Sequence, residues 1–269
     1  MQIQNKIGEG LFGQIHKCLT DDGNTCAIKI YKERCPRKLR EKEIKILQSI
    51  SHTNIQKIVK SDQEYKWFIT ELMNQDLYQM IIKHGCLQQS TIKQILLQLS
   101  NGLSYLHQLG YVHRDIKLEN VMMTKEPVIK FIDFGLSVYI DYNKQYPRHC
   151  GTSTYMAPEL NLDDKLIMGE ILKKSDIFAL GVLIFILCYG CPPFTIAKST
   201  ECKFWQTIEQ RKWQSFWNYF DKKIIRSDDH FKNLIQNMLE PDHKSRFTIQ
   251  QVKEHQYLNE VGNLNELLL

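Results

Sequence analysis

The sequence predicts an α+β protein of two lobes, in which a small antiparallel sheet with one helix precedes a larger helical lobe. Up to about residue 71, short runs of β-branched and aromatic residues alternate with Gly and Asp, a pattern typical of strands joined by turns. From about residue 76, apolar residues recur every three or four positions, which is the period of amphipathic helices. We therefore expect one domain over residues 1–269, with lobes at about 1–71 and 76–269 and a hinge at about 72–75.

The first lobe contains one segment whose period differs from that of its neighbours. In Arg37–Ile50, the residues Leu39, Ile44, Leu47 and Ile50 lie among charged side chains, which predicts an amphipathic helix. The remaining runs are short, rich in β-branched residues and bounded by turn residues. The predicted strands are Ile3–Gly8, Gly13–Leu19, Cys26–Tyr31, Ile55–Lys60 and Trp67–Glu71.

The clearest helix of the second lobe is predicted over Ser90–Gln108, where six Ile and Leu residues form a single apolar stripe. Ser90 is expected to cap its first turn, and Gly110 is expected to end it. The same period predicts three further helices, namely Ser175–Tyr189, Asp229–Leu239 and Thr248–His255.

Charge and hydropathy exclude two classes of protein. The 35 basic and 30 acidic residues are scattered rather than gathered in a stripe, which argues against a nucleic-acid-binding surface. The longest apolar run, Ile177–Cys191, is shorter than the roughly 18–20 residues that a membrane-spanning helix needs. It follows Asp176 and ends at Pro192, so we expect a buried helix and no membrane span.

The cysteines indicate a reducing compartment. The eight residues lack the density and spacing of a secreted disulfide framework, and Cys188 and Cys191 have no second pair at the spacing of a zinc site. The chain also begins with the polar segment Met1–Lys6 rather than with a signal segment. A cytoplasmic location, extending to the nucleus, is therefore expected.

A glycine-rich pattern lies between the first two predicted strands. Glycines let a backbone approach phosphates closely, with its amide groups facing the anion. A plain hairpin turn without a ligand is one alternative. A dinucleotide site is another, but it needs a helix directly after the last glycine, and a strand is predicted there. The pattern reads Gly8-Glu9-Gly10-Leu11-Phe12-Gly13-Gln14-Ile15.

Two motifs of the second lobe carry the groups that phosphoryl transfer requires. Asp115 can accept a proton from an incoming hydroxyl, and Lys117 can neutralise a phosphoryl group. Asn120 and Asp133 offer the oxygen ligands that Mg²⁺ prefers. The motifs read His113-Arg114-Asp115-Ile116-Lys117-Leu118-Glu119-Asn120 and Asp133-Phe134-Gly135.

With these motifs the sequence resembles the eukaryotic serine/threonine protein kinases, from Ile7 to about Tyr257. Cys26-Ala27-Ile28-Lys29 resembles the V-A-I-K strand of that family, and Gly151–Glu159 resembles its G-T-x-x-Y-x-A-P-E segment. At the positions of Lys117 and Thr152 the sequence resembles the serine/threonine kinases, because tyrosine kinases have different residues at both places. The resemblance implies a two-lobed protein-kinase-like fold, a single kinase domain, ATP and Mg²⁺ as cofactors, and signalling through protein substrates with Ser or Thr acceptors.

The resemblance also implies roles for individual residues. The catalytic set is Asp115, Lys117, Lys29 and its counter-ion Glu43, which the register with Leu47 favours over Glu41. Asn120 and Asp133 would bind the metal. The residues implied in nucleotide binding are Ile7, Gly8, Glu9, Gly10, Leu11, Phe12, Gly13, Gln14, Ile15, Ala27, Lys29, Thr70, Glu71, Met73, Asp76 and Met122. For Asp76, the cap of a helix is an equally open alternative.

Three supporting contacts follow from the same resemblance. Asp176 would accept hydrogen bonds from the backbone of the catalytic loop, and Glu159 would pair with Arg246. His113 is expected to be a packed support rather than a proton carrier. Arg148 stands where many relatives have a phosphorylatable Ser or Thr. We therefore hypothesise that activity does not require phosphorylation at that position.

Two other classes of protein were weighed against an active protein kinase. A pseudokinase that binds nucleotide as a scaffold would have lost Lys29, Asp115, Asn120 or Asp133, and all four are present. A kinase of small molecules would lack the segment ending at Glu159. A monomer is expected, and the sequence does not identify regulatory partners.

Overall fold

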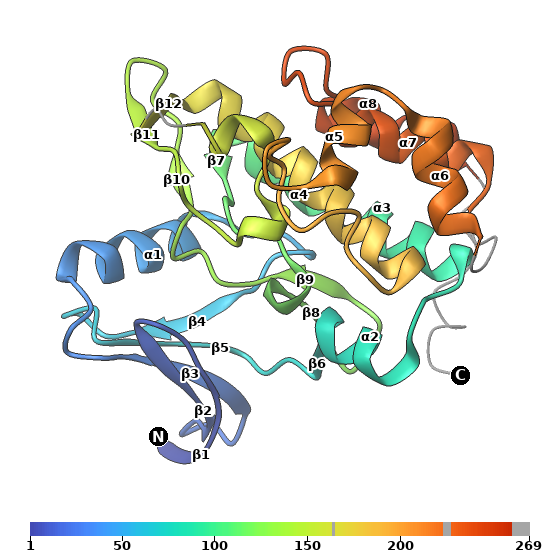
Figure 1. Ribbon diagram of the computed structural model, residues 1–269. Helices are drawn as coiled ribbons and strands as arrows, with labels where there is room; N and C mark the ends of the chain where they lie inside the picture. The colour runs from blue at the N-terminus through green and yellow to red at the C-terminus, as the bar shows by residue number, and fades with distance from the viewer. Residues whose placement is uncertain (163–164, 223–226, 260–269) are drawn as a thin grey trace.

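The computed structural model describes residues 1–162, 165–222 and 227–259, and it has the two lobes that the sequence predicts. Figure 1 shows the five-stranded sheet and α1 on one side and the helices α3 to α8 on the other. The sheet is antiparallel, in the order β1-β2-β3-β5-β4. Its strands are β1 (Gln2–Glu9), β2 (Gly13–Leu19), β3 (Thr25–Tyr31), β4 (Ile58–Ser61) and β5 (Trp67–Glu71).

Strand β4 differs most from its predicted position, because it begins at Ile58 rather than at Ile55. Ile55 is instead buried against the second lobe, where it forms an isolated bridge with Phe131. The backbone N–H of Gln56 donates to the Phe131 carbonyl at 2.9 Å. The first residues of the predicted strand, Ile55 and Gln56, therefore contact the second lobe and do not belong to β4.

Helix α1 (Arg37–Ser49) packs one face against the sheet, and Glu43 lies on that buried face together with Ile44 and Leu47. The prediction from the apolar spacing is confirmed apart from the last residue, since Ile50 already has extended backbone angles. A carboxylate on an apolar helix face needs a partner, which the sheet supplies.

The second lobe is built around α3 (Gln89–Gln108) and α4 (Gly169–Tyr189), which pack against each other. Helix α4 contains the apolar run Ile177–Cys191 up to Tyr189, and nearly all of its side chains in that run are buried. The other helices are α2 (Leu77–His84), α5 (Lys203–Glu209), α6 (Trp213–Asp221), α7 (Asp229–Met238) and α8 (Ile249–Lys253). Across the described residues, no helix has the length and apolarity required to cross a membrane.

The predicted cap of α3 is wrong. The helix begins at Gln89, the cap position is Gln88, and Ser90 lies inside the first turn. The backbone N–H of Leu87 donates to the Leu187 carbonyl of α4 at 2.8 Å, so a tertiary contact places the start of the helix. The predicted end is confirmed, because Gly110 has a φ of 80° and terminates the helix.

Three small sheets connect these helices and were not predicted. They place the catalytic loop and the segment that follows it, with short 3-10 turns at Leu118–Asn120, Ser153–Tyr155, Pro158–Leu160 and Gln256–Leu258. Helix α4 also starts earlier than predicted, at Gly169 instead of Ser175. One sheet has three strands in the order β6 (Gln75–Asp76), β8 (Val121–Met123) and β9 (Ile129–Phe131). The two others are pairs, β7 (Tyr111–Val112) with β10 (Val138–Tyr139) and β11 (Gln145–Pro147) with β12 (Leu166–Met168).

A buried ion pair ties the segment after β11 to the end of the second lobe. Arg246 is only 1% exposed, and its guanidinium donates to the two oxygens of Glu159 at 2.6 and 2.8 Å. The hydroxyl of Ser175 on α4 donates to the same carboxylate at 2.8 Å. The predicted pairing of Glu159 with Arg246 is confirmed, and both partners are fully hydrogen-bonded, as buried charges need to be.

Replacing Arg246 with Met should destabilise the protein by about 3–5 kcal/mol near neutral pH, because Glu159 would keep a buried charge without its cation. In the wild type, burial alone would raise the pKa of Glu159, but Arg246 holds it below its ordinary value. This stabilisation is present above the unfolded-state pKa of about 4.3 and is lost as the pH falls. In the variant Glu159 can take up a proton, so the difference between the proteins should shrink near pH 4.

Urea unfolding of both proteins at about pH 7 and pH 4 measures this difference. Lys45→Met is a suitable control, because the Lys45–Glu41 pair lies on the exposed face of α1 and should leave the midpoint unchanged. An Arg246 variant as stable as this control would contradict the interpretation.

Candidate active site

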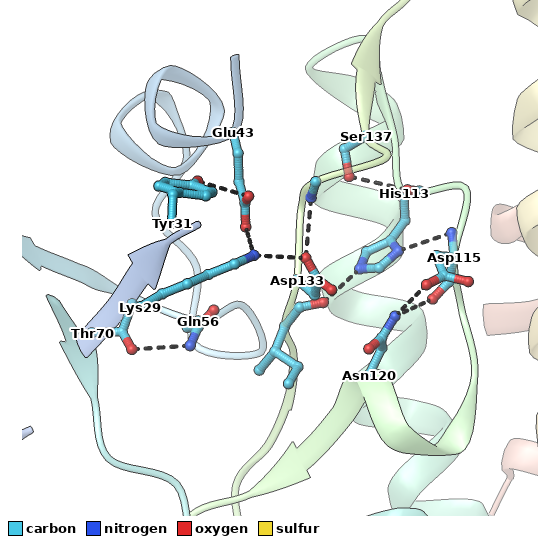
Figure 2. A network of polar contacts seen from close by, with 12 residues as sticks. Lys29, Tyr31, Glu43, Gln56, Thr70, His113, Asp115, Asn120, Asp133 and Ser137 are labelled. Carbon is cyan, nitrogen blue, oxygen red and sulfur yellow. Dashed lines mark hydrogen bonds and ion pairs between the residues drawn. The ribbon is translucent and has the colours of Figure 1, made fainter. Parts of the chain in front are cut away.

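The ammonium group of Lys29 lies between two carboxylates from different parts of the chain (Figure 2). Its Nζ is 2.6 Å from Glu43 Oε1 on α1 and 3.2 Å from Asp133 Oδ1, which follows β9. Burial alone would lower the pKa of Lys29, but the charges of Glu43 and Asp133 raise it above its ordinary value. Lys29 is therefore held as a cation, and three segments distant in sequence meet at its amine.

Tyr31 also belongs to this cluster, although no sequence motif pointed to it. Its hydroxyl donates to Glu43 Oε2 at 2.8 Å, so the two oxygens of the carboxylate receive bonds from two residues of one strand. The signal was available, because alternate residues of a strand point to the same face and Tyr31 follows Lys29 by two positions.

The direction of the Asp133 side chain is set by its own backbone conformation and by the burial of the next residue, Phe134. It has a φ of 58°, and the Gly135 N–H donates to its Oδ1 at 3.3 Å. Phe134 is fully buried, with its ring centroid 5.0 Å from that of His113. Burial alone would raise the pKa of Asp133, but Lys29 lowers it below its ordinary value, so the group is a carboxylate.

A second cluster joins the loop before β8 to the segment after β11. It consists of Asp115, Lys117 and Asn120 from that loop and Thr152 from that segment. Lys117 Nζ lies 2.8 Å from Asp115 Oδ2, and Asn120 Nδ2 donates to the same oxygen at 2.8 Å. The hydroxyl of Thr152 accepts from Lys117 Nζ at 3.1 Å and donates to Asp115 Oδ1 at 3.2 Å. Both oxygens of Asp115 are thus fixed in direction by neighbouring donors.

Asp176 of α4 holds the backbone of this loop, as the sequence predicts. Its Oδ2 accepts from the His113 N–H and its Oδ1 from the Arg114 N–H, each at 2.9 Å. His107 Nε2 lies 3.0 Å from Oδ2 and is a further partner that the sequence analysis missed. Arg114 has a φ of 69°, and these bonds hold that left-handed backbone in place.

The ring of His113 lies between the two clusters, and both of its nitrogens have a hydrogen-bond partner. Nε2 lies 3.0 Å from the carbonyl of Ile132, the residue before Asp133, and Nδ1 accepts from the Asp115 N–H at 3.3 Å. Its side chain is completely buried. His113 is therefore packed and hydrogen-bonded, as predicted, and these contacts support its interpretation as a structural residue.

The glycine-rich hairpin lies over Lys29 through the register of the sheet. Gly8 pairs with Ile15 across β1 and β2, and Ile15 pairs with Lys29 across β2 and β3. The turn closes through the Gly10 N–H and the Gly13 carbonyl at 2.9 Å. A methyl group on Gly13 would lie 3.1 Å from the Ile30 carbonyl, so a side chain would press the turn away from β3.

Several side chains of the glycine-rich hairpin are exposed or form ion pairs with nearby lysines. Leu11 and Ile7 are exposed, and Glu9 binds Lys32 and Lys6 outside the turn. Hydrogen bonds from Lys32 and Lys6 lower the pKa of Glu9 to about 2. The predicted contribution of Glu9 to nucleotide binding would therefore come from its backbone.

The residues predicted around the hinge lie along β3, β5, β6 and β8. Ala27 pairs with Thr70 across β3 and β5, and Asp76 pairs with Met122 across β6 and β8. The N–H of Gln79 donates to Asp76 Oδ1 at 2.7 Å, so Asp76 is the N-cap of α2. Its predicted contact with a nucleotide stays a prediction.

Two side chains near the hinge have partners that the sequence did not reveal. Gln56 Nε2 donates to Thr70 Oγ1 at 3.0 Å (Figure 2). Glu71 Oε1 accepts from Lys130 Nζ on β9 at 2.9 Å, which links the end of β5 to the second lobe. Long-range contacts of this kind have no local sequence signal.

The donor atoms of Asn120 and Asp133 fit Mg²⁺. Asn120 uses its amide nitrogen on Asp115, which leaves its side-chain oxygen as the atom available to a cation. The Ile132 N–H donates to the Asn120 carbonyl at 3.0 Å and joins the two segments. Mg²⁺ typically takes one or two protein oxygens and completes its shell with water and phosphates. In the part of the chain that the structure describes, no group of three or more His, Cys, Asp and Glu residues forms an alternative site.

A half-buried Lys29 paired with the buried Glu43 lies beside a glycine hairpin. Together with the Asp–Lys–Asn loop, this pair is typical of a phosphotransferase site between two lobes. The family model described as "Protein kinase domain" matches residues 1–258. The chain belongs to the protein kinase family, which confirms the fold class that the sequence predicts.

Curated relatives extend this similarity over most of the chain. The chain is 30% identical over 267 residues to Calcium-dependent protein kinase 4 of Plasmodium berghei, and the match covers 94% of this chain and 48% of that protein. It is 32% identical over 247 residues to the Probable serine/threonine-protein kinase CCRP1 of Zea mays, covering 90% and 37%. It is 30% identical over 274 residues to Serine/threonine-protein kinase DCLK3 of Mus musculus, covering 98% and 33%. The chain therefore spans half or less of the length of these relatives.

Asp176→Asn should lower kcat by about 10- to 100-fold, because an amide would turn an N–H group toward one of the two backbone donors it now binds. The nucleotide KM should change less, since Lys29 and Glu43 do not touch Asp176. Steady-state kinetics on a peptide substrate separate the two constants. Asp62→Asn, in an exposed turn of the first lobe, is the matched control and should behave as the wild type. Equal kinetics in both variants would show that Asp176 does not position the loop.

Proposed function

We propose that this chain is a serine/threonine protein kinase, which transfers the γ-phosphoryl group of ATP to Ser or Thr hydroxyls of protein substrates with Mg²⁺ as cofactor. The observation that carries the proposal is the position of Lys29 between Glu43 and Asp133, beside the hydrogen-bonded cluster of Asp115. These two clusters match the two tasks of phosphoryl transfer, which are to hold the nucleotide and to orient the acceptor.

The acceptor side follows from the contacts of Asp115. Lys117 and Thr152 hold its carboxylate in a fixed direction, so it can orient an incoming hydroxyl and accept its proton. Lys117 is also placed to neutralise charge on the group in flight. The Lys117–Thr152 contact is the feature that supports the serine/threonine branch.

The nucleotide side follows from the contacts of Lys29. Glu43 and Tyr31 keep its ammonium group in place, where it can bind the α- and β-phosphates beneath the glycine hairpin. The backbone groups of Glu71 and Met73 are proposed to bind the adenine. Asn120 and Asp133 would hold Mg²⁺, which when bound neutralises charge on the phosphate oxygens.

The proposed cellular setting follows from the cysteines and the fold. The eight cysteines lack the density and spacing of a secreted disulfide framework, which supports a reducing location in the cytoplasm and also the nucleus. A monomer that acts in signalling on protein substrates is consistent with the fold. A nucleotide-binding scaffold without turnover is the alternative, but the chain retains Lys29, Asp115, Asn120 and Asp133.

Asp115→Asn and Lys29→Met should each lower phosphorylation of a peptide array by at least about a hundredfold, since each removes a group that acts on the reacting atoms. Excess EDTA should abolish the signal and added Mg²⁺ should restore it. Glu41→Gln, on the exposed side of the α1 helix that carries Glu43, is the matched control and should retain wild-type activity. Undiminished phosphorylation in the first two variants would point to a contaminating kinase.

Arg148 holds the segment before Glu159 through hydrogen bonds to backbone carbonyls, without a phosphate group. Its side chain is 8% exposed, and its guanidinium donates to the carbonyls of Glu159 and of Leu166, the latter at 2.9 Å. Arg114 donates to the carbonyl of Pro147 in the same segment. Arg148 replaces the residue that would be phosphorylated in a switch of this kind, and both Arg148 and Arg114 here bind backbone oxygens.

Phosphatase treatment should therefore leave the activity within about twofold of the untreated protein, because guanidinium–carbonyl bonds survive it. Intact mass before and after treatment shows whether any phosphate was present and removed. Arg148→Met should lower activity by about tenfold, as buried carbonyls lose their donor. Activity that disappears with the phosphate would overturn the hypothesis.

A further inference from the structure

We propose that Tyr31 is a positioning residue of the phosphoryl-transfer reaction, whose hydroxyl holds the second oxygen of Glu43 and so keeps α1 and Lys29 in their working arrangement. The inference deepens the proposed function and rests on its assignment of the Lys29–Glu43 pair. Tyr31 is not one of the residues that the family motifs single out in this sequence.

The need for a second donor follows from the burial of Glu43. This residue is only 3% exposed, so its carboxylate is almost completely removed from water. Lys29 binds Oε1 at 2.6 Å, so without another donor Oε2 would be buried without a hydrogen bond, which is costly for a charged group. The Tyr31 hydroxyl at 2.8 Å supplies that bond (Figure 2).

Tyr31 itself is fixed by its surroundings. The side chain is 8% exposed, and its ring centroid lies 6.0 Å from that of Phe68 on β5. Its backbone N–H donates to the Lys66 carbonyl at 2.9 Å. Burial, followed by the charge of Glu43, raises the pKa of Tyr31 above its ordinary value, so the hydroxyl keeps the proton that it donates.

The consequence is a coupling between one strand and one helix through two bonds instead of one. Lys29 and Tyr31 leave the same face of β3, and both end on the carboxylate of Glu43. Two side chains of β3 therefore hold α1 against the sheet of the first lobe. A lysine that also has to contact Asp133 and phosphates can shift without releasing α1, because the tyrosine retains it.

A purely space-filling role for the Tyr31 ring is the competing explanation, and Tyr31→Phe separates the two. The variant keeps the ring against Phe68 and removes only the hydroxyl. We expect kcat of the full chain to fall by about tenfold while the KM for a peptide substrate stays within about twofold. Tyr257→Phe is the matched control, since it removes a buried hydroxyl bonded to Gln89 in the second lobe, and its kcat should be that of the wild type.

A double-mutant cycle with Glu43→Met tests whether the hydroxyl acts through Glu43. In that background Tyr31→Phe should change kcat by less than about twofold, because the partner is already absent. The same tenfold loss in both backgrounds would overturn the proposal, as would a Tyr31→Phe enzyme with the wild-type kcat.

Amide hydrogen exchange of the α1 helix gives a readout that does not depend on turnover. The residues of α1 should exchange faster in Tyr31→Phe than in the wild type, while Tyr257→Phe leaves them unchanged. Unchanged exchange in Tyr31→Phe would overturn the proposal even if the chain proved inactive. Failure of the proposed function is recognised separately, by wild-type phosphorylation that Asp115→Asn does not reduce.

Discussion

The contact of one ammonium group with two carboxylates is the interaction on which the arrangement of the active site depends. Glu43 and Asp133 repel each other, and only the cation between them lets both approach the same point. Lys29 lies in the sheet, Glu43 in α1 and Asp133 in the second lobe. The contacts of this single cluster therefore depend on the relative position of the sheet, α1 and the second lobe.

The second lobe provides a rigid base for this cluster. Helix α4 is buried along most of its length, and its Asp176 and Ser175 reach the catalytic loop and the Glu159–Arg246 pair respectively. At both places several donors meet the buried carboxylate, as the cost of desolvation demands. Two adjacent residues of one helix hold the two segments between which a substrate hydroxyl would lie.

Local sequence patterns predicted the elements whose cause is local. The hairpin glycines, the strands β2 and β5 and the buried face of α1 follow from turn chemistry and periodicity, and the structure has them at or near the predicted positions. The start of β4 and the cap of α3 were predicted wrongly. In both places a contact with a distant segment, Phe131 or Leu187, outweighs the local preference.

The sequence by itself determined the chemistry, because residue types at fixed spacing show which charges and donors the chain can bring to a phosphate. It pointed to Asp115, Lys117, Asn120 and Asp133 without any knowledge of distances, and the resemblance to the protein kinases added Lys29. Only the tertiary structure decided which groups support them, such as Tyr31 on Glu43 and His107 on Asp176. A hydrogen bond between buried groups depends on a separation of a few tenths of an ångström, and packing sets that separation, not spacing along the chain.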